Sequence, residues 1–148
     1  MVIFQSELAP KFNIMIKELQ ADSDIVIMSR YIPGGGDERL LLRSLVSKYF
    51  NLFARLILRM PIKDLTNSIF LMKRKVLDEV TFLGYGHGEF FIEFIYKAHK
   101  RGLKIFEVPF VQPPDIEKMS KTASNIFRFF CLGFYYLTAI VHSLTRRD

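Results

Sequence analysis

The sequence predicts an α/β fold in which a small sheet is flanked by helices and followed by a hydrophobic helix at the C-terminus. Three observations predict it. Residues 25–28 form a short apolar run with β-branched side chains, which is typical of a buried strand. Residues 40–60 carry apolar side chains at helical spacing. Residues 104–109 form a second candidate strand, which is closed by a proline.

The composition indicates a single domain with an anionic partner. At 148 residues the chain is one domain at most, and 50% hydrophobic residues are enough to fill a core. A net charge of +6 favours nucleic acid, anionic lipid or a phosphorylated small molecule as the partner. The phenylalanines cluster in apolar runs and do not alternate with Lys or Arg, so we predict no nucleic-acid partner. The one cysteine, Cys131, excludes an internal disulfide and fits a reducing compartment.

The N-terminal region predicts a strand and then a helix. Residues 1–8 begin with a short apolar run, from which we expect the strand. Ala9 and Pro10 predict the start of the helix, because proline is favoured in a first helical turn. The helix is expected to end near Ala21, and its apolar residues at helical spacing are Phe12, Met15, Ile16 and Leu19.

The chain is organised around residues 23–48, where the buried strand runs into Arg30, a glycine run and a basic helix. Residues 33–36, Pro-Gly-Gly-Gly, predict a loop. The helix places Arg43, Ser47 and Asn51 on one face, since they are four residues apart. Two arginines and a hydroxyl beside a glycine loop suit a phosphate. The alternative is a surface turn followed by a solvated basic helix.

The helix predicted over residues 40–60 has a broad apolar face and a separate basic stripe. Lys48, Arg55 and Arg59 form the stripe, which is either solvated or in contact with an anionic membrane. Pro61 ends the helix because proline cannot continue it.

The second half of the chain alternates loops, a helix and a strand. A glycine-rich loop over residues 84–88 precedes a helix with Glu89 and Glu93 one turn apart, and Gly102 ends that helix. The strand over residues 104–109 follows, and then a loop over residues 111–115.

A hydrophobic helix is expected over residues 125–144. Its uninterrupted apolar part, residues 129–144, would extend about 24 Å at ~1.5 Å per residue, whereas a bilayer core needs ~30 Å. We therefore expect an interfacial or docking helix first, a short membrane span second and a buried core helix third. Arg128, Arg146 and Arg147 flank it and would lie at lipid head groups.

Several of these segments together resemble a known family. The segment DIVIMSRYIPGGG, the following R-x-x-x-S-x-x-x-N and the later E-V-P strand are similar to the second half of the dolichyl-phosphate mannose synthase branch of family 2 glycosyltransferases. The resemblance extends from about residue 5 to the C-terminus and is strongest over residues 24–108. It implies part of a Rossmann-like GT-A sheet over residues 1–122, followed by a membrane-associating helix over residues 123–148.

The resemblance implies five residues for the phosphate of a polyprenyl (dolichyl) phosphate acceptor. Arg30, Arg43 and Ser47 lie where the family holds that phosphate, and Ser120 and Lys121 match its E-S-K loop. The sugar would come from a nucleotide-sugar, GDP-mannose or a UDP-sugar, and the reaction would take place at the cytoplasmic face of a membrane.

The resemblance also implies catalytic and metal-binding residues. Asp64 begins a stretch similar to the family's D-x-T-S-G-F loop, from which Asn67 and Ser68 depart, and a turn role for Asp64 is the alternative. Residues 70–80 match the strand and helix that follow this loop. Glu93 matches the glutamate of the F-Q-I-E-x-x-Y-x-A helix and would be a base or a positioning residue. Glu7 would ligate Mg²⁺ or Mn²⁺, at the place of the family's Asp-x-Asp motif.

Family members also have a preceding half that binds the nucleotide, and no counterpart of that half is found in this sequence. We therefore expect an incomplete glycosyltransferase that needs its donor site from elsewhere. A partner chain or a homo-oligomer would complete the sheet. The alternative is a non-catalytic, membrane-associated binding protein.

Overall fold

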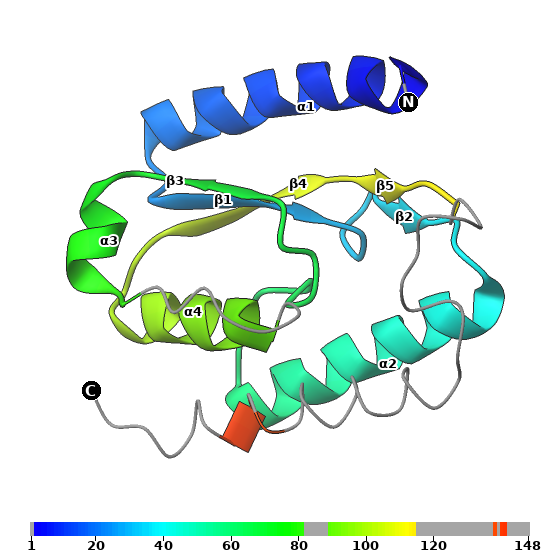
Figure 1. Cartoon of the computed structure of the whole chain (residues 1–148). Coiled ribbons are helices and arrows are strands. Elements are labelled where there is room, and N and C mark those ends of the chain that lie inside the picture. The colour runs from blue at the N-terminus through cyan, green and yellow to red at the C-terminus, as the bar shows by residue number, and fades with distance from the viewer. Residues whose placement is uncertain (1, 82–88, 115–137, 139, 142–148) are drawn as a thin grey trace.

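The computed structural model describes residues 2–81, 89–114, 138, 140 and 141, and it has the predicted mixed α/β fold (Figure 1). A small sheet is flanked by helices. In chain order the elements are α1 (Val2–Ala21), β1 (Ile25–Ser29), β2 (Gly36–Asp37), α2 (Leu41–Leu58), β3 (Phe70–Met72), α3 (Lys75–Glu79), α4 (Glu89–Lys100), β4 (Ile105–Pro109) and β5 (Val111–Gln112).

The main sheet has three strands in the order β3-β1-β4. β1 runs parallel to β4, with Ile25 opposite Ile105, and antiparallel to β3, with Ile25 opposite Met72. β2 and β5 form a separate parallel pair. All five residues of β1 are buried, as expected for a central strand covered on both faces.

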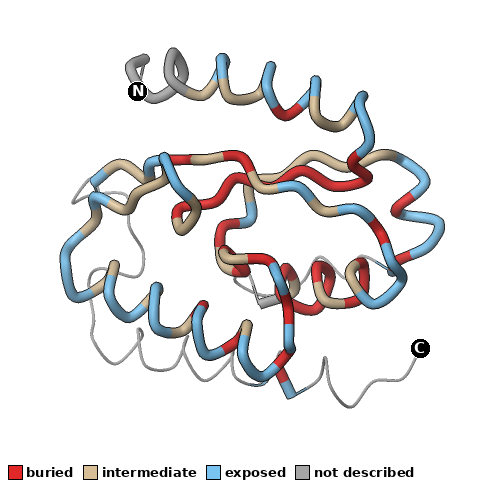
Figure 2. Tube along the Cα trace, turned by 180° about the vertical axis from the view of Figure 1, so that it is seen from behind, coloured by how far each residue is buried: buried red, intermediate tan, exposed pale blue. Residues whose placement is uncertain are grey.

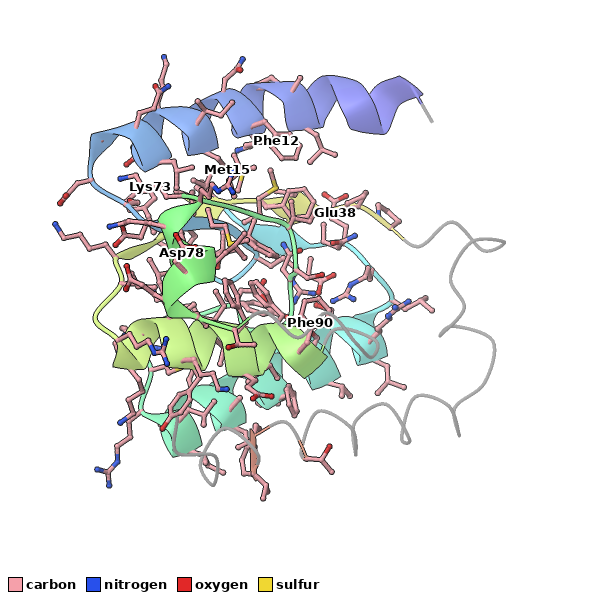
Figure 3. The ribbon with its side chains drawn as sticks, turned by 60° about the vertical axis from the view of Figure 1, so that its left-hand side comes forward. Phe12, Met15, Glu38, Lys73, Asp78 and Phe90 are labelled. Atoms are coloured by element: carbon pink, nitrogen blue, oxygen red, sulfur yellow. The ribbon has the colours of Figure 1, made fainter. Side chains whose placement is uncertain are left out.

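Helices cover both faces of the sheet. α1 lies on one face and α4 on the other, with α2 as a further layer beyond α4 (Figure 1). Phe12 and Met15 point from α1 toward the sheet (Figure 3), and Met15 packs with Val26 and Met28 of β1. The opposite core joins Ile25 and Ile27 of β1 to α4 and to part of α2. In the burial view, the buried residues concentrate on the sheet and α4 (Figure 2).

The prediction of a strand over residues 1–8 is wrong, because α1 extends from Val2 through Ala21 with Pro10 inside it. The apolar residues explain the helix. Leu8, Phe12 and Leu19 are spaced by four and seven residues, and they pack beside Met15 against one face of the sheet. The expected end of the helix at Ala21 is confirmed.

The long helix was predicted almost to its ends, but its burial differs from that expected of a broad apolar face. α2 ends at Leu58, and Arg59 adopts a left-handed conformation (φ 51°) two residues before Pro61. Its buried residues are Asn51, Ala54 and Leu58. The large apolar residues of α2 exposed by 39–74% are Leu41, Leu42, Leu45, Val46, Tyr49, Leu52, Phe53, Leu56 and Ile57. Only a narrow stripe of α2 therefore packs on the core.

The strand over residues 104–109, the helix from Glu89 and the strand-then-helix over residues 70–80 are confirmed by β4, α4, β3 and α3. The loop over residues 111–115 is corrected in part, since Val111 and Gln112 form β5 against β2.

The loop over residues 84–88 and most of the helix over residues 125–144 lie outside the described residues, so the domain boundary at residue 122 stays a prediction. Thr138, Ile140 and Val141 are helical, and Ile140 packs into the core beside α4. In the part of the chain that is described, no helix is both long enough and apolar enough to cross a bilayer.

The glycine turn after β1 leaves no room for a side chain at Gly35. A Cβ built there would lie 2.6 Å from the backbone oxygen of Ser29 and 2.8 Å from that of Arg30. These are backbone atoms of the segment that carries the candidate site, so they cannot move aside as a flexible side chain would.

We expect Gly35→Ala to lower the free energy of unfolding by about 2 kcal/mol, because the added methyl group overpacks against backbone. Urea unfolding followed by circular dichroism measures this. Gly36→Ala is the matched control, since its Cβ would lie 3.6 Å from Val111, an ordinary contact distance. Equal effects of the two substitutions would contradict the close approach at Gly35.

Candidate functional site

The candidate site lies at the carboxyl ends of the parallel strands β1 and β4. Such ends meet at one edge of a sheet, where α/β proteins place their ligands. Arg30 directly follows β1, and the loop over residues 63–67 passes beside it. Glu107 of β4 holds this loop, since its carboxylate accepts hydrogen bonds from the backbone N–H groups of Lys63 (3.0 Å) and Asp64 (3.1 Å).

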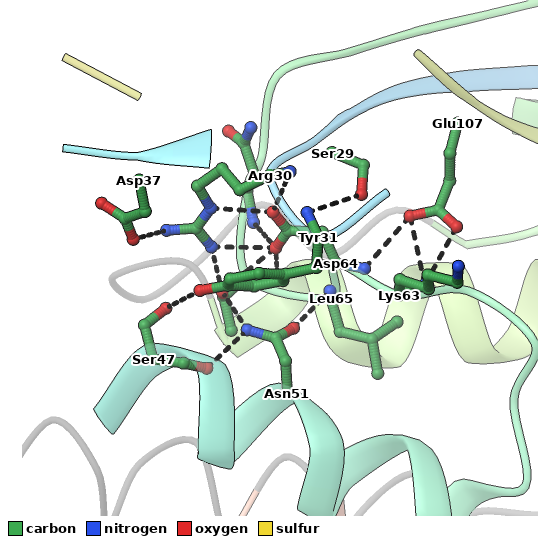
Figure 4. Close-up of polar contacts among 12 residues, drawn as sticks. Ser29, Arg30, Tyr31, Asp37, Ser47, Asn51, Lys63, Asp64, Leu65 and Glu107 are labelled. Carbon is green, nitrogen blue, oxygen red and sulfur yellow. Dashed lines mark hydrogen bonds and ion pairs between the residues drawn. The ribbon is translucent and has the colours of Figure 1, made fainter. Parts of the chain in front are cut away.

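A buried ion pair joins Arg30 to Asp64 (Figure 4). The Asp64 carboxylate accepts from Arg30 Nε at 2.8 Å, from Arg30 Nη2 at 2.9 Å and from the Arg30 backbone N–H at 3.0 Å. It also accepts from the backbone N–H groups of Thr66 and Asn67. Asp64 is fully buried. This geometry favours the turn role for Asp64, and its catalytic role stays a prediction.

Arg30 is held by a second carboxylate as well. Its Nη1 lies 3.5 Å from Asp37 of β2, and Arg39 Nε donates to the same carboxylate at 2.7 Å. Burial acts to lower the pKa of Arg30, but the hydrogen bond and charge of Asp64 outweigh it and raise that pKa above its usual value. A phosphate at Arg30 would therefore share a guanidinium already engaged by two carboxylates, so this acceptor role stays a prediction.

Asn51 ties α2 to the loop. Its Oδ1 accepts from the Leu65 N–H at 2.6 Å, and its Nδ2 donates to Thr66 Oγ1 at 2.8 Å and to the Ser47 carbonyl at 2.8 Å. Asn51 is 1% exposed, so these bonds satisfy a polar side chain that would otherwise cost stability. Asn51 thus fixes how α2 lies against the Arg30–Asp64 pair.

Tyr31 brings Ser47 into the same network. The Tyr31 hydroxyl donates to Ser47 Oγ at 2.9 Å, and the Arg30 guanidinium lies 5.0 Å from the centroid of the Tyr31 ring. Burial raises the pKa of the Tyr31 phenol, so it stays protonated at neutral pH. Arg43, one turn before Ser47 on α2, is half-buried like Ser47. The structure therefore brings Arg30 and Ser47 together through Tyr31.

Glu93 lies in a different environment, within the buried helix α4. Its carboxylate pairs with Lys97 Nζ at 3.2 Å, and both side chains are nearly buried. Phe91 and Phe94 of the same helix pack against Phe70. Phe91 stands where the F-Q-I-E-x-x-Y-x-A motif has glutamine, so this position is part of the core. The role of Glu93 as a base or positioning residue stays a prediction.

The predicted metal site gains no support from the described residues. Glu7 lies inside α1, not at the end of a strand. Within residues 2–81, 89–114, 138, 140 and 141, no group of three or more His, Cys, Asp or Glu side chains is placed to hold a metal ion. Glu7 as a ligand of Mg²⁺ or Mn²⁺ therefore stays a prediction, as do Ser120 and Lys121, which lie outside the described residues.

Several residues of this network had no predicted role. Asn51 was expected on the helix face of Arg43 and Ser47, but no partner was predicted for it. Glu107 belonged to the E-V-P strand without a role of its own. Tyr31 and Asp37 gave no signal, since their partners are fixed only by the tertiary fold.

We expect Asp64→Asn to lower the free energy of unfolding by about 3 kcal/mol, because it leaves the buried charge of Arg30 without its main partner. Chemical denaturation of the purified chain measures this. Asp22→Asn is the matched control, since it breaks an exposed pair with Lys104 and should cost less than about 1 kcal/mol. A loss no larger than that of the control would show that the buried pair does not hold the loop.

Comparison with known proteins gives a partial match. No family model matches the sequence. The chain is similar to the polyprenol monophosphomannose synthase of Mycolicibacterium smegmatis (strain ATCC 700084 / mc(2)155), with 32% identity over 101 residues. The match covers 64% of this chain and 37% of the mycobacterial protein, so the chain spans little more than a third of that relative. This similarity agrees with the resemblance to family 2 glycosyltransferases.

Proposed function

We propose that this chain is the acceptor-side part of a glycosyltransferase that transfers a sugar from a nucleotide-sugar to a polyprenyl phosphate at a membrane surface. The observation that carries the proposal is the 32% identity over 101 residues to a protein named polyprenol monophosphomannose synthase. Because the chain spans 37% of that relative, we expect the donor nucleotide-sugar to be bound mainly by residues beyond this chain.

The position of Arg43 and Ser47 supports the acceptor side of the proposal. Both lie half-buried on one face of α2, and Tyr31 links that face to the carboxyl end of β1. An arginine fork and a hydroxyl donor one helical turn apart suit a phosphate group. Arg30, which is held by Asp64 within the protein, lies beside this face through its contact with the Tyr31 ring.

The proposed chemistry is a displacement at the anomeric carbon of the donor sugar. An oxygen of the lipid phosphate forms a bond to that carbon, and the bond to the nucleoside diphosphate breaks. The phosphate is already ionised at neutral pH, so the step does not require Asp64 or Glu93 as a base. The described residues do not supply a metal site, and we derive no step through Mg²⁺ or Mn²⁺.

The surface of α2 supports a membrane location. The helix contains no Asp or Glu, and it carries Arg43, Lys48 and Arg55 among exposed apolar residues. Leu41 is 74% exposed and Leu56 is 69% exposed. An apolar surface with basic residues binds the interface of an anionic membrane by burying the apolar groups and pairing the charges. We propose a peripheral position at the cytoplasmic face.

Binding to vesicles tests the acceptor site. The chain should bind phosphatidylcholine vesicles that contain polyprenyl phosphate more tightly than vesicles that contain the uncharged polyprenol of equal length. Arg43→Gln should weaken this phosphate-dependent binding by about tenfold, since a hydrogen bond to a charged group contributes roughly 1.5–3 kcal/mol. Co-sedimentation at fixed salt measures the affinity.

Lys48→Gln is the matched control, because it removes the same charge from an exposed position on α2. Vesicles with phosphatidylglycerol in place of polyprenyl phosphate control for negative charge alone. Equal losses for the two variants, or equal binding to both anionic lipids, would contradict a specific phosphate site on this face.

A second measurement tests the membrane surface. Replacing both Leu41 and Leu56 by Asn should weaken binding to polyprenol-containing vesicles by about tenfold or more, since each buried leucine contributes roughly 1.5–3 kcal/mol. Leu77→Asn on α3, at a residue 49% exposed, serves as the control for a lost apolar side chain away from α2. Unchanged binding of the double variant would contradict a membrane role for α2.

A further inference from the structure

We infer that Tyr31 is a positioning residue for Ser47, which it orients so that the serine hydroxyl donates its hydrogen to the acceptor phosphate. The inference rests on the proposed function and adds to it a residue that has no assigned role in binding. It starts from one hydrogen bond, which joins the Tyr31 hydroxyl to Ser47 Oγ at 2.9 Å (Figure 4). The phenol is the more acidic of the two hydroxyls and therefore the better donor, so Tyr31 donates and Ser47 accepts.

That direction determines what remains available at Ser47. A serine hydroxyl has one hydrogen to donate and two lone pairs to accept with. One lone pair takes the hydrogen from Tyr31, and among the described residues no acceptor takes the hydrogen of Ser47. Ser47 is half-buried, so its remaining hydrogen is within reach of a ligand beside α2. Arg43 lies one turn away on the same face.

Accepting a bond also makes Ser47 a better donor. Hydrogen bonds in series polarise one another, so a hydroxyl that accepts from a phenol donates more strongly to the next group. The hydrogen bond that Ser47 donates would therefore be strongest to an anionic acceptor, such as a phosphate oxygen.

Contacts within the protein hold both Tyr31 and Ser47 in place. The Arg30 guanidinium lies 5.0 Å from the centroid of the Tyr31 ring, and it is held by two hydrogen bonds to the Asp64 carboxylate. On the other side, Asn51 Nδ2 donates to the carbonyl of Ser47 and so holds the backbone that presents the hydroxyl. Both partners of the Tyr31–Ser47 bond thus have supported positions before any ligand arrives.

The experiment compares vesicle binding of Tyr31→Phe, Ser47→Ala and the double variant, with polyprenyl phosphate and with polyprenol. Tyr31→Phe removes one oxygen and should weaken phosphate-dependent binding by about three- to tenfold, the size of a typical net hydrogen bond. It should leave binding to polyprenol vesicles unchanged. The double variant should bind no more weakly than Ser47→Ala alone, because Tyr31 acts through Ser47.

Tyr96→Phe is the matched control, since it removes the same oxygen from a tyrosine of α4, away from the proposed membrane surface of α2. If Tyr31→Phe binds like Tyr96→Phe while Ser47→Ala is weakened, the inference is overturned and the proposed function stands. If the unsubstituted chain does not distinguish polyprenyl phosphate from polyprenol, the proposed function fails and the inference with it.

A measurement on the unsubstituted chain covers the case in which Tyr31→Phe does not fold. The carbon-13 resonance of Tyr31 Cζ reports on the hydrogen bond of its hydroxyl. The Tyr31 resonance should shift when micelles with polyprenyl phosphate replace micelles with polyprenol, while the Cζ resonance of Tyr96 on α4 should not. A tyrosine with only a structural role would have the same chemical shift in both kinds of micelle. Equal shifts for Tyr31 would therefore overturn the inference.

Discussion

The buried pair of Arg30 and Asp64 is the interaction on which the rest of the structure depends. Removing two charges from water is costly, and the attraction between them compensates only if hydrogen bonds satisfy the remaining donors and lone pairs. Here the backbone of Arg30, the loop N–H groups and Thr66 meet that requirement. The pair therefore fixes the loop over residues 63–67 at the end of β1, and a change at either partner would release both.

Two further side chains connect the loop over residues 63–67 to β4 and to α2. Glu107 fixes the start of the loop to β4, and Asn51 fixes its middle to α2. Among the described residues, Ala54 and Leu58 of α2 are buried in the core, and Phe50 packs against it. The other large apolar side chains of α2 are exposed by 39–74%. An apolar surface therefore lies next to the candidate phosphate site.

Local pattern was sufficient to predict most helices and strands of the described chain. β1, α2 and β4 follow from runs of apolar residues, helical spacing and the prolines that end them. The prediction of an N-terminal strand was wrong because a short apolar run is compatible with a strand or a helix. The spacing of the apolar residues from Leu8 to Leu19 favours the helix. The exposure of α2 could not be predicted, since periodicity indicates an apolar face but not what covers it.

Some residues of the candidate site, among them Arg30, Ser47 and Asp64, were predictable from the sequence, but their contacts were not. Arg30 and Asp64 are separated by 34 residues, and no local spacing indicates that they pair. That pairing affects one of the predicted phosphate ligands, because Asp64 already binds the guanidinium of Arg30. Arg30 and Arg39 face Asp37 and Asp64, so the charges at the end of β1 balance within the protein. Arg30 therefore holds the loop over residues 63–67 and the Tyr31 ring at this edge of the sheet, and the Tyr31 hydroxyl is hydrogen-bonded to Ser47 of α2.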